Sequence, residues 1–413
     1  MKKIWLLGIG EPLCIDGDDV RLRRLGNFAS YLSEFDDVDL HYFSISFEHY
    51  NKYQRVTCDT TFDIKDNYKM HIVRVPGYKK NISIQRIICH KVSAKKIVKW
   101  MEKMGSPDIV YCGNTPLELV NRMQQFANER NIPTIVDMRD LWPDIYLDSL
   151  PQKYRFVIKP YVSICKHNMK RTYKRISAFV GLSPAFLQYA LDIAGREKCD
   201  KDKIIPIGYP DYDYNVKPEI FDDLWKQYGI KHDDFIIAFT GNFGRQFCFD
   251  PIVEAANELK NESKVKFVLC GTGLQENTIK QRVGKNVIFP GWIGKDMIIS
   301  LLRFSSVGIA PYIDSFNYRM NTPNKFGEYL SAGLPILMGV DGIMRETVET
   351  NKCGYYYKNG AELKKIIEII YGDLTLQNEL RTNARKVYER FYSLNIANEN
   401  LTNMVFELIG GDK

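Results

Sequence analysis

One pattern occurs twice in this chain and limits it to an α/β architecture with two domains. Each copy opens with an apolar run that ends in a glycine turn, and a helical segment follows. The first run is Lys3 to Ile9, with Gly10 behind it, and the second is Phe235 to Thr240, followed by Gly241 and Gly244. Because further apolar runs alternate with helical stretches in both halves, the pattern predicts two parallel sheets with helices on both faces.

The two copies are separated by a linker rich in Pro, Tyr and Asp, residues 206–218. We therefore predict an N-terminal Rossmann-like domain of residues 1–208, a C-terminal Rossmann-like domain of residues 209–388, and a helical segment, residues 389–413, that packs back on the first domain. A length of 413 residues is enough for two cores of ordinary size. Ligands of open parallel sheets bind at the carboxyl ends of the strands, so we expect the functional site in a central cleft between the domains.

The individual elements are predicted from the apolar runs and their glycine or proline borders. In the first half, helices are expected at residues 20–33 and 117–131, and further strands at residues 38–46, 109–112, 134–136 and 178–182. In the second half, a helix is expected at residues 251–260 and further strands at residues 267–270, 287–289, 307–310 and 335–338.

Composition excludes several classes of protein. A hydrophobic content of 45% and a charged content of 26% are typical of a folded globular protein. No apolar run approaches the roughly 18 residues of a membrane span, and the first run ends at Glu11 and Pro12 without a cleavage site, so we predict a cytosolic protein. The nine cysteines are scattered without a C-x-x-C pair, which predicts neither a disulfide framework nor a metal site.

Common cofactor and nucleotide motifs are missing from the sequence. Gly8 and Gly10 lack the third glycine of a dinucleotide fingerprint, and the strand at residues 38–46 does not lead to an acid that could hold a ribose, which argues against NAD and FAD. The sequence contains neither G-x-x-x-x-G-K-S/T nor G-x-S-x-G, so a P-loop and a hydrolase elbow are excluded. We expect no cofactor.

The stretch PNKFGEYLSAGLP, Pro323 to Pro335, places Lys325 and Glu328 one helical turn apart. At a strand-to-helix corner of a parallel sheet, backbone amides and the helix N-terminus favour an anion. Lys325 can then meet a phosphate, and Glu328 can accept hydrogen bonds from two sugar hydroxyls. The alternative is an ordinary surface pair at i,i+3.

Two acidic pairs have the spacing that binds a divalent ion and a nucleotide in some sugar transferases. Asp37 and Asp39 stand at the entry of a strand, and Asp211 and Asp213 in the linker, so solvated loop acids are the better interpretation. If no metal is bound, basic side chains and helix N-termini must neutralise a leaving diphosphate.

Taken in order, the motifs resemble glycosyltransferase family 4, which has the GT-B fold, and more closely its bacterial members that build surface polysaccharides. The resemblance covers nearly the whole chain. It is carried in the first half by GEPLCIDGDDVRLRRLGNFASYL, SISFEHYNKYQR, DMRDLWPDIY and AFVGLS. In the second half it is carried by FTGNFG, FVLCGTG, IFPGW, APY and PNKFGEYLSAGLP.

The resemblance implies a nucleotide-diphosphate sugar as donor substrate. Glu328 would bind its ribose, Lys325 and Arg245 would face its diphosphate, and Trp292 would lie near its base unless it is a plain core or cleft-wall aromatic. The donor-binding residues implied in this way are Gly10, Gly244, Arg245, Trp292, Asn324, Lys325 and Glu328.

The chain departs from the family pattern at two places. The first glutamate of the usual E-x7-E pair is replaced by Met320, so Asn321, Asn324 and nearby backbone amides are candidates to contact the transferred sugar. Many relatives carry a histidine near the reacting carbon where this chain has Arg139, which cannot act as a base and would steady charge. The neighbouring Asp140 could instead cap the next turn.

The resemblance further implies a retaining, metal-independent hexosyltransferase, with Arg139, Lys325 and Glu328 as catalytic residues. The acceptor proton would pass to the departing phosphate oxygen, so no dedicated base is needed. Two other functions remain open: a nucleotide-sugar epimerase of the same fold, and a non-catalytic nucleotide-sugar-binding protein.

The acceptor is expected on the first half, where basic residues are in excess: 33 Lys and Arg against 24 Asp and Glu in residues 1–210. Lys79 to Trp100 has the pattern of a basic amphipathic stretch, which suits an anionic membrane surface, or else a solvated helix of a globular domain. We therefore predict a peripheral protein of the inner face of the plasma membrane with a lipid-linked or oligosaccharide acceptor. Arg21 and Arg24 are candidates for its phosphates or for a plain helix face. No nucleic-acid signature is present.

Overall fold

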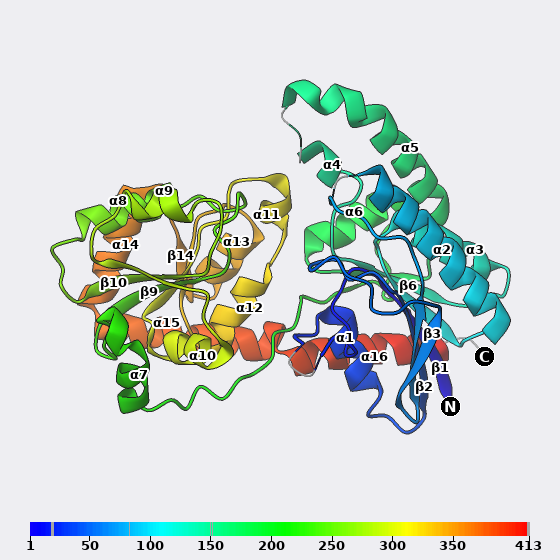
Figure 1. Cartoon of the computed structure of the whole chain (residues 1–413), viewed down its shortest axis with the longest axis horizontal. Helices are drawn as coiled ribbons and strands as arrows, with labels where there is room; N and C mark the ends of the chain where they lie inside the picture. Colours follow the sequence, from blue (N-terminus) through cyan, green and yellow to red (C-terminus); the bar gives the residue numbers. More distant parts are fainter. Residues whose placement is uncertain (18–19, 82, 149, 151, 411–413) are drawn as a thin grey trace. The chain divides into compact units, whose positions relative to one another are not determined.

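The computed structural model describes residues 1–17, 20–81, 83–148, 150 and 152–410. The chain divides into two compact units (Figure 1). The first unit comprises Met1–Ile205 together with the chain from Asn398 onward, and the second comprises Pro206–Ala397.

The first unit is built on an eight-stranded sheet with the order β3-β4-β2-β1-β5-β6-β7-β8. All neighbours pair in parallel except β3 and β4, which form an antiparallel pair. The strands are β1 (Lys2–Leu7), β2 (Val38–Ile45), β3 (Thr60–Lys65), β4 (Tyr68–Val73), β5 (Ile109–Gly113), β6 (Thr134–Met138), β7 (Ala178–Gly181) and β8 (Lys203–Ile204).

Two helices of this unit, α2 and α6, begin at serine caps. Ser83 accepts a hydrogen bond from the Arg86 amide at the start of α2, and Ser183 accepts one from the Phe186 amide at the start of α6, which ends at the left-handed Gly195. The helices are α1 (Arg24–Leu32), α2 (Ile84–Met104), α3 (Leu117–Asn128), α4 (Ile145–Asp148), η1 (Gln152–Tyr154), α5 (Arg155–Tyr173) and α6 (Pro184–Ala194).

The last helix, α16 (Leu394–Gly410), begins in the second unit and continues into the first from Asn398. Its Phe406 packs edge-on against Phe35, with 5.7 Å between ring centroids, and lies under the Lys2 ammonium. The end of the chain is therefore part of the core and surface of the first unit.

The second unit contains a fully parallel six-stranded sheet with the order β11-β10-β9-β12-β13-β14. Its strands are β9 (Phe235–Thr240), β10 (Val265–Cys270), β11 (Val287–Gly291), β12 (Val307–Ala310), β13 (Ile336–Met338) and β14 (Gly354–Tyr356). Its helices are α7 (Pro218–Trp225), η2 (Lys226–Tyr228), α8 (Asp250–Glu258), α9 (Glu276–Lys280), α10 (Lys295–Phe304), α11 (Phe316–Met320), α12 (Asn324–Ser331), α13 (Ile343–Thr350), α14 (Gly360–Gly372), α15 (Leu374–Val387) and the π-helical turn η3 (Tyr388–Tyr392).

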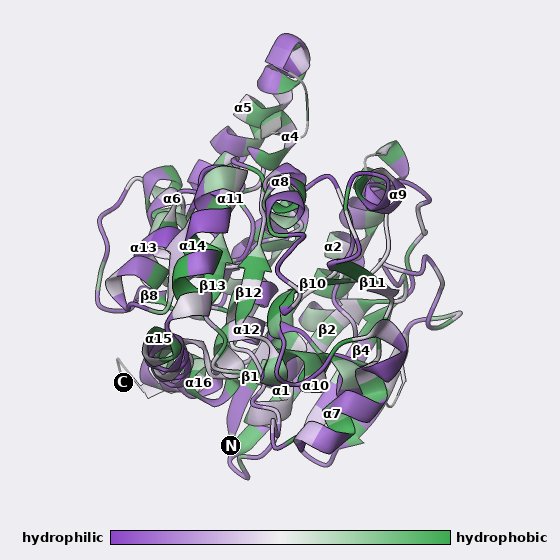
Figure 2. Cartoon of the chain, turned by 90° about the vertical axis from the view of Figure 1, so that its left-hand side faces the viewer, coloured by the Kyte–Doolittle hydropathy of each residue, from purple (hydrophilic) through white to green (hydrophobic). Residues whose placement is uncertain are grey.

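Figure 2 shows hydrophobic residues concentrated in strands such as β10 and β12, whereas helices such as α14 alternate hydrophilic and hydrophobic faces. Strands β9 and β12 are buried along their whole length. Burial on both faces is the reason these strands are continuous apolar runs, and it is why the sequence located them closely.

In each unit the strand order reverses beside the first strand, between β1 and β5 and between β9 and β12. At such a switch point the loops that follow the two strands diverge to opposite faces, which leaves a crevice for ligands at the carboxyl end of the sheet. The residues that follow β1, β5, β9 and β12 are therefore the first places to look for a site.

Two sequence predictions differ from the structure. The first helix starts at Arg24, later than the expected residue 20. The β3–β4 hairpin was not predicted, although β3 alternates between half-buried and exposed positions and Asp66 and Asn67 form the turn that follows it.

Acid should destabilise the first unit because several of its histidines are buried in the neutral form. Burial lowers the pKa of His71 and of His49 to about 4 and that of His90 to about 3. The unfolded chain binds protons near pH 6.5 where the folded chain does not, so stability falls as the pH drops from about 7 to about 4, by up to about 3 kcal/mol for the buried His71 and by less for the half-buried His49 and His90. Urea unfolding at pH 7 and pH 5 measures this loss.

The matched control is His90→Gln, which removes one titrating ring and keeps a hydrogen-bonding side chain. We expect this variant to lose less stability between pH 7 and pH 5 than the unmodified protein. Equal stability of the unmodified protein at both pH values contradicts the interpretation.

Candidate nucleotide-sugar site

Three glycine corners form the carboxyl edge of the second sheet beside its switch point. Gly241 follows β9, Gly271 follows β10 and Gly291 ends β11, and all three have positive φ. The Gly241 amide donates to the Cys270 carbonyl at 2.9 Å, and the Gly271 amide donates to the Gly291 carbonyl at 2.7 Å. A Cβ on Gly271 would lie 1.8 Å from the Gly241 carbonyl oxygen, so only glycine permits this approach of the two loops.

The Lys325 ammonium lies against the first of these corners. A Cβ on Gly241 would lie 2.3 Å from Lys325 Nζ, and the ammonium is 4.6 Å from the centroid of the Phe239 ring. Lys325 belongs to the first turn of α12 and is partly exposed. The structure thus brings a cation from α12 to the end of β9. That this cation contacts a phosphate stays a prediction.

Glu328 lies one turn further along α12 and is buried. Tyr209 donates a hydrogen bond to its Oε1 and Thr240 donates one to its Oε2, each at 2.8 Å. These two partners were not identified from the sequence, although Thr240 is the last residue of β9 and directly precedes the glycine corner. The carboxylate is therefore held in one position at the switch point.

Other predicted donor residues of this unit lie on the loops after β9 and at the start of α12. Arg245 and Asn324 are exposed, and Gly244 is half-buried beside the Gln246 side chain. Gln275 donates to the Gly244 carbonyl at 2.6 Å and fixes this loop to the one after β10. Arg245 therefore presents its charge to solvent from an anchored loop.

Trp292 directly follows β11 and is 78% exposed. This exposure rules out the alternative that Trp292 is a core aromatic. An exposed indole at the end of the strand is available to stack on a base or to form the wall of a cleft.

The loop between α11 and α12 contains buried oxygen atoms without a hydrogen-bond partner among the described residues. They are Asn321 Oδ1 and Thr322 Oγ1, and Asn317 Oδ1 in α11 shares this property. Buried polar groups are normally paired, so these atoms fit a polar ligand or ordered water. Asn321 and Thr322 directly follow Met320, which stands where the family pattern has the first glutamate of its E-x7-E pair.

In the first unit, the loop after β1 contains Gly10 at a φ of +84°, a backbone conformation that favours glycine. Nothing lies within 4 Å of the position of a Cβ on this residue. The loop therefore offers bare backbone, as predicted for an approach to phosphates.

Arg139, which follows β6, forms an ion pair with Glu11, and its Nε lies 3.9 Å from Asp137 Oδ2. Its guanidinium also fills the space above Gly113, where a Cβ would lie 2.3 Å from Nη2. Burial lowers the pKa of Arg139 to about 10. Glu11 was not predicted from the sequence as a partner of Arg139. The negative charge of Glu11 already balances the positive charge of Arg139.

Arg24 is buried in helix α1 and donates from Nε to Asp137 Oδ2 at 2.8 Å. Asp137 is fully buried, and burial raises its pKa against the opposing effect of Arg24. This placement favours the structural alternative for Arg24 over a role at the acceptor phosphates. Arg21 is exposed in the segment that precedes α1.

The basic stretch Lys79 to Trp100 contains α2, whose apolar residues are largely used inside the unit. Cys89, Ile97 and Val98 are buried, and Ile84 and Ile88 remain exposed near the start of the helix. This is the burial expected for a solvated helix of a globular domain.

Both acidic pairs engage basic side chains of their own unit. Asp37 pairs with Lys2, Asp39 with His41, and Asp211 with Arg385. Within the described residues no group of three or more His, Cys, Asp or Glu side chains is arranged to hold a metal ion. No helix in the described ranges is long and apolar enough to cross a membrane.

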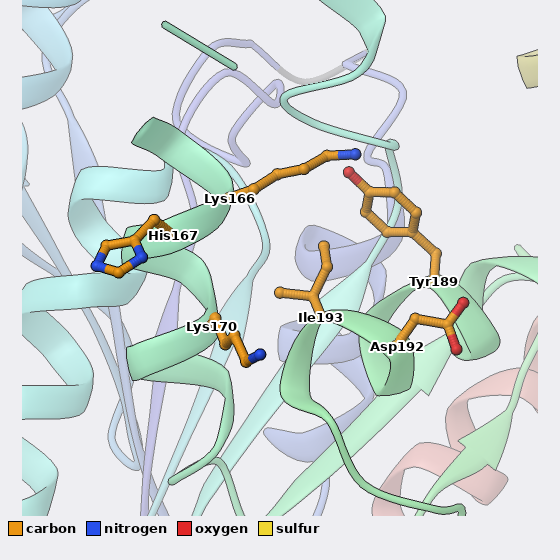
Figure 3. A pocket seen from close by; sticks show the side chains of 6 residues that line it. All are labelled: Lys166, His167, Lys170, Tyr189, Asp192 and Ile193. Atoms are coloured by element: carbon orange, nitrogen blue, oxygen red, sulfur yellow. The ribbon is translucent and has the colours of Figure 1, made fainter. Parts of the chain in front are cut away.

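A pocket of about 390 Å³ lies between α5 and α6 of the first unit (Figure 3). Lys166 pairs with Asp144 at 2.7 Å, and Tyr189 donates to the same carboxylate at 2.8 Å. The lining residues are Lys166, His167, Lys170, Tyr189, Asp192 and Ile193. None of the predicted donor or acceptor residues belongs to it.

Residues 221–387 match the family described as Glycosyl transferases group 1. This segment belongs to the group 1 glycosyl transferases. It contains the glycine corners, Arg245, Trp292, Lys325 and Glu328, so every predicted donor residue of the second unit lies inside the glycosyl transferase segment.

A curated relative, alpha-monoglucosyldiacylglycerol synthase from Acholeplasma laidlawii, is 25% identical over 206 residues. The match covers 45% of this chain and 50% of the relative, so the chain matches about half of that protein's length.

Solved structures with the same fold cover nearly the whole chain. Sucrose-phosphate synthase from Thermosynechococcus elongatus has a TM-score of 0.70 at 14% identity and covers 100% of both chains. HepE from Anabaena, solved with UDP and glucose, has a TM-score of 0.64 at 14% identity and covers 98% of this chain and all of its own. The fold is therefore the GT-B fold of two Rossmann-like domains that the sequence predicted.

A substitution at the first glycine corner of the glycosyl transferase segment should disturb the Lys325 ammonium. Gly241→Ala places a methyl group 2.3 Å from Lys325 Nζ, and the φ of +143° is strained for alanine. We expect nucleoside-diphosphate binding to weaken by about tenfold or more. Calorimetric titration with UDP and GDP measures this loss.

Gly229→Ala is the matched control, because Gly229 has a φ of +66° and nothing within 4 Å of its Cβ position. The Gly229→Ala variant places an alanine at a positive φ without any contact at its Cβ. We expect this variant to bind the nucleotide as the unmodified protein does. Equal binding losses in both variants contradict a specific role for the Gly241 corner.

Proposed function

We propose that this protein is a retaining, metal-independent glycosyltransferase that moves a sugar from a nucleotide-diphosphate sugar to a lipid-linked acceptor in surface-polysaccharide synthesis. The observation that carries the proposal is the position of Lys325 and Glu328. Both project from α12 to the end of β9, at the switch point of a parallel sheet, inside a segment of group 1 glycosyl transferase sequence.

In this proposal a carboxylate binds the ribose of the donor and basic side chains bind its diphosphate. Glu328, held in position by Tyr209 and Thr240, accepts hydrogen bonds from the ribose hydroxyls. Lys325 and Arg245 contact the diphosphate, where negative charge develops as the sugar leaves. The solved structures of HepE with UDP and glucose support a nucleotide sugar as the class of donor.

The transferred sugar lies beside the loop between α11 and α12. Asn321 and Thr322 carry oxygen atoms that no described protein group satisfies, and sugar hydroxyls are suitable donors for them. In the proposal, these side chains take the place of the glutamate that the family pattern has where this chain has Met320. The sugar carbon exchanges its bond to phosphate for a bond to the acceptor oxygen on the same face, and the acceptor proton passes to the departing phosphate oxygen.

The acceptor side of the proposal rests on the first unit, with its excess of basic residues. Helix α5 and the turn before it supply six of them, and Lys174 and Arg175 directly follow the helix. We place the protein at the inner face of the plasma membrane, where anionic lipids attract such segments. The curated relative, whose name describes a diacylglycerol glycolipid synthase, supports an acceptor that resides in a membrane.

The proposal is tested by incubating the protein with a panel of nucleotide sugars, with and without membrane extract as acceptor. Free nucleoside diphosphate that accumulates only with acceptor supports transfer. An isomerised donor without acceptor identifies an epimerase, and tight nucleotide binding without turnover identifies a binding protein. Either of these two outcomes overturns the proposal.

A further inference from the structure

Helix α5 exposes a row of large apolar side chains that no element of its own unit covers. Phe156 is 69% exposed, Val157 is 66% exposed and Ile164 is 61% exposed. Phe156, Pro160 and Ile164 are spaced at i, i+4 and i+8 and share one helix face. The residues that α5 buries are Val162, Met169 and Tyr173, which form a different face.

Single exposed apolar residues are common, but a contiguous apolar patch marks an interaction surface. Tyr154 precedes this helix and is also exposed, and Tyr161 follows within the same turns at 38% exposure. Figure 1 shows the first turns of α5 extending beyond the sheet of the first unit together with α4. The patch is therefore accessible to a broad, flat partner as well as to a small one.

The charged residues of α5 and its flanks have a single sign. Residues 152–175 contain eight Lys and Arg and no Asp or Glu. Lys159, Lys166 and Lys170 follow one flank of α5 at i, i+7 and i+11, and Figure 3 shows Lys166 and Lys170 on the side that faces Tyr189 and Ile193. The acidic groups nearby are Asp144, which pairs with Lys166, Asp192, which accepts a hydrogen bond from Gln188, and Glu118, whose charge acts on Tyr161 and Cys165.

We infer that the N-terminal half of α5 is a membrane-contact segment, which inserts Phe156, Val157 and Ile164 among the headgroups of an anionic bilayer while its lysines contact lipid phosphates. An exposed apolar row flanked by basic residues, with tyrosines at its border, is the composition that binds such an interface. This inference rests on the proposed function. It identifies α5 as the surface through which the protein contacts the membrane.

Two competing surfaces are less suitable. A second copy of the chain bound through the same face would bring two strongly basic helices together, which like-charge repulsion opposes. Helix α2 also presents lysines, but most of its apolar residues are buried or half-buried and only Ile84 and Ile88 are exposed, so it offers charge with a smaller apolar patch.

The test is flotation of the full chain with vesicles of phosphatidylcholine alone or of equal parts phosphatidylcholine and phosphatidylglycerol. We expect binding only to the anionic vesicles and a loss of binding at high salt. Phe156→Ser/Ile164→Ser and the charge variant Lys159→Gln/Lys170→Gln/Lys174→Gln should each weaken binding by about tenfold or more. Because all five positions are exposed, these variants should fold, and their melting temperatures check this.

The matched controls are on α2: Ile84→Ser/Ile88→Ser and Lys91→Gln/Lys95→Gln/Lys99→Gln, which should change binding less than twofold. Loss in the α2 variants with none in the α5 variants overturns the inference, as does equal binding to neutral vesicles or no binding. Conversion of a dimer to a monomer by Phe156→Ser/Ile164→Ser assigns the patch to a second copy instead. Binding of UDP and GDP in the second unit, measured in the same variants, tests the proposed function separately.

Discussion

Lys325→Ala is expected to lower kcat/KM for sugar transfer by about 10² to 10³-fold while the protein remains folded. The Lys325 ammonium is positioned at the Gly241 corner, where the leaving diphosphate is proposed to lie. A preorganised charge of this kind acts mainly when the sugar departs, so the loss should fall on kcat as well as on KM. Initial rates across donor concentrations, with saturating acceptor, measure both constants.

Lys365→Ala is the control for this experiment, because Lys365 is an exposed lysine on α14 of the same unit. It removes the same charge from the surface without touching the glycine corners. We expect it to retain full activity. A Lys325→Ala enzyme as active as Lys365→Ala would remove Lys325 from the mechanism and with it the main support for the donor site.

Much of the second unit could be predicted because its strands obey a simple rule. A strand buried on both faces is a continuous apolar run, and β9 and β12 were predicted at their observed limits for this reason. The glycine turn at Gly241 and the helix start at Lys325 were each predicted from local signals, whereas their contact became visible only in the fold. A glycine turn follows a strand, and a lysine stands behind a proline at a helix start.

Contacts between residues far apart in the sequence could not be predicted in the same way. Glu328 is held by Tyr209, 119 positions away, and Arg139 pairs with Glu11 from another strand end. No local pattern encodes such a pair, because its geometry depends on the order of strands in the sheet. The role of Arg24 was left open for this reason, and its burial against Asp137 became visible only in the fold.

Exposure of apolar residues is a further property that the sequence pattern does not settle. Lys79 to Trp100 contains more branched apolar residues than α5, yet four of the six in α2 are buried or half-buried. In α5 the same kinds of side chain lie at positions that the sheet does not reach. Amphipathic periodicity identifies a face, but the neighbouring elements decide whether that face belongs to the core or to a partner.

Arg24→Met is expected to destabilise the first unit by about 3 kcal/mol, because it leaves the fully buried Asp137 carboxylate without its nearest cation. Arg139 Nε, at 3.9 Å, offsets part of the loss. Urea unfolding monitored by fluorescence measures the change. The double variant Arg24→Met/Asp137→Leu removes both charges, and we expect it to recover most of the lost stability, since an apolar pair needs no solvation.

The pH dependence of this loss distinguishes an unpaired charge from a simple packing defect. Burial already raises the pKa of Asp137, and removal of Arg24 raises it further. With a folded pKa above the unfolded value of about 3.9, the native state binds the additional proton between the two values. Stability relative to the unmodified protein should therefore be lowest near pH 7 and should partly recover at pH 5. A deficit that is the same at both pH values would show that Arg24 acts through its packing and not through its charge.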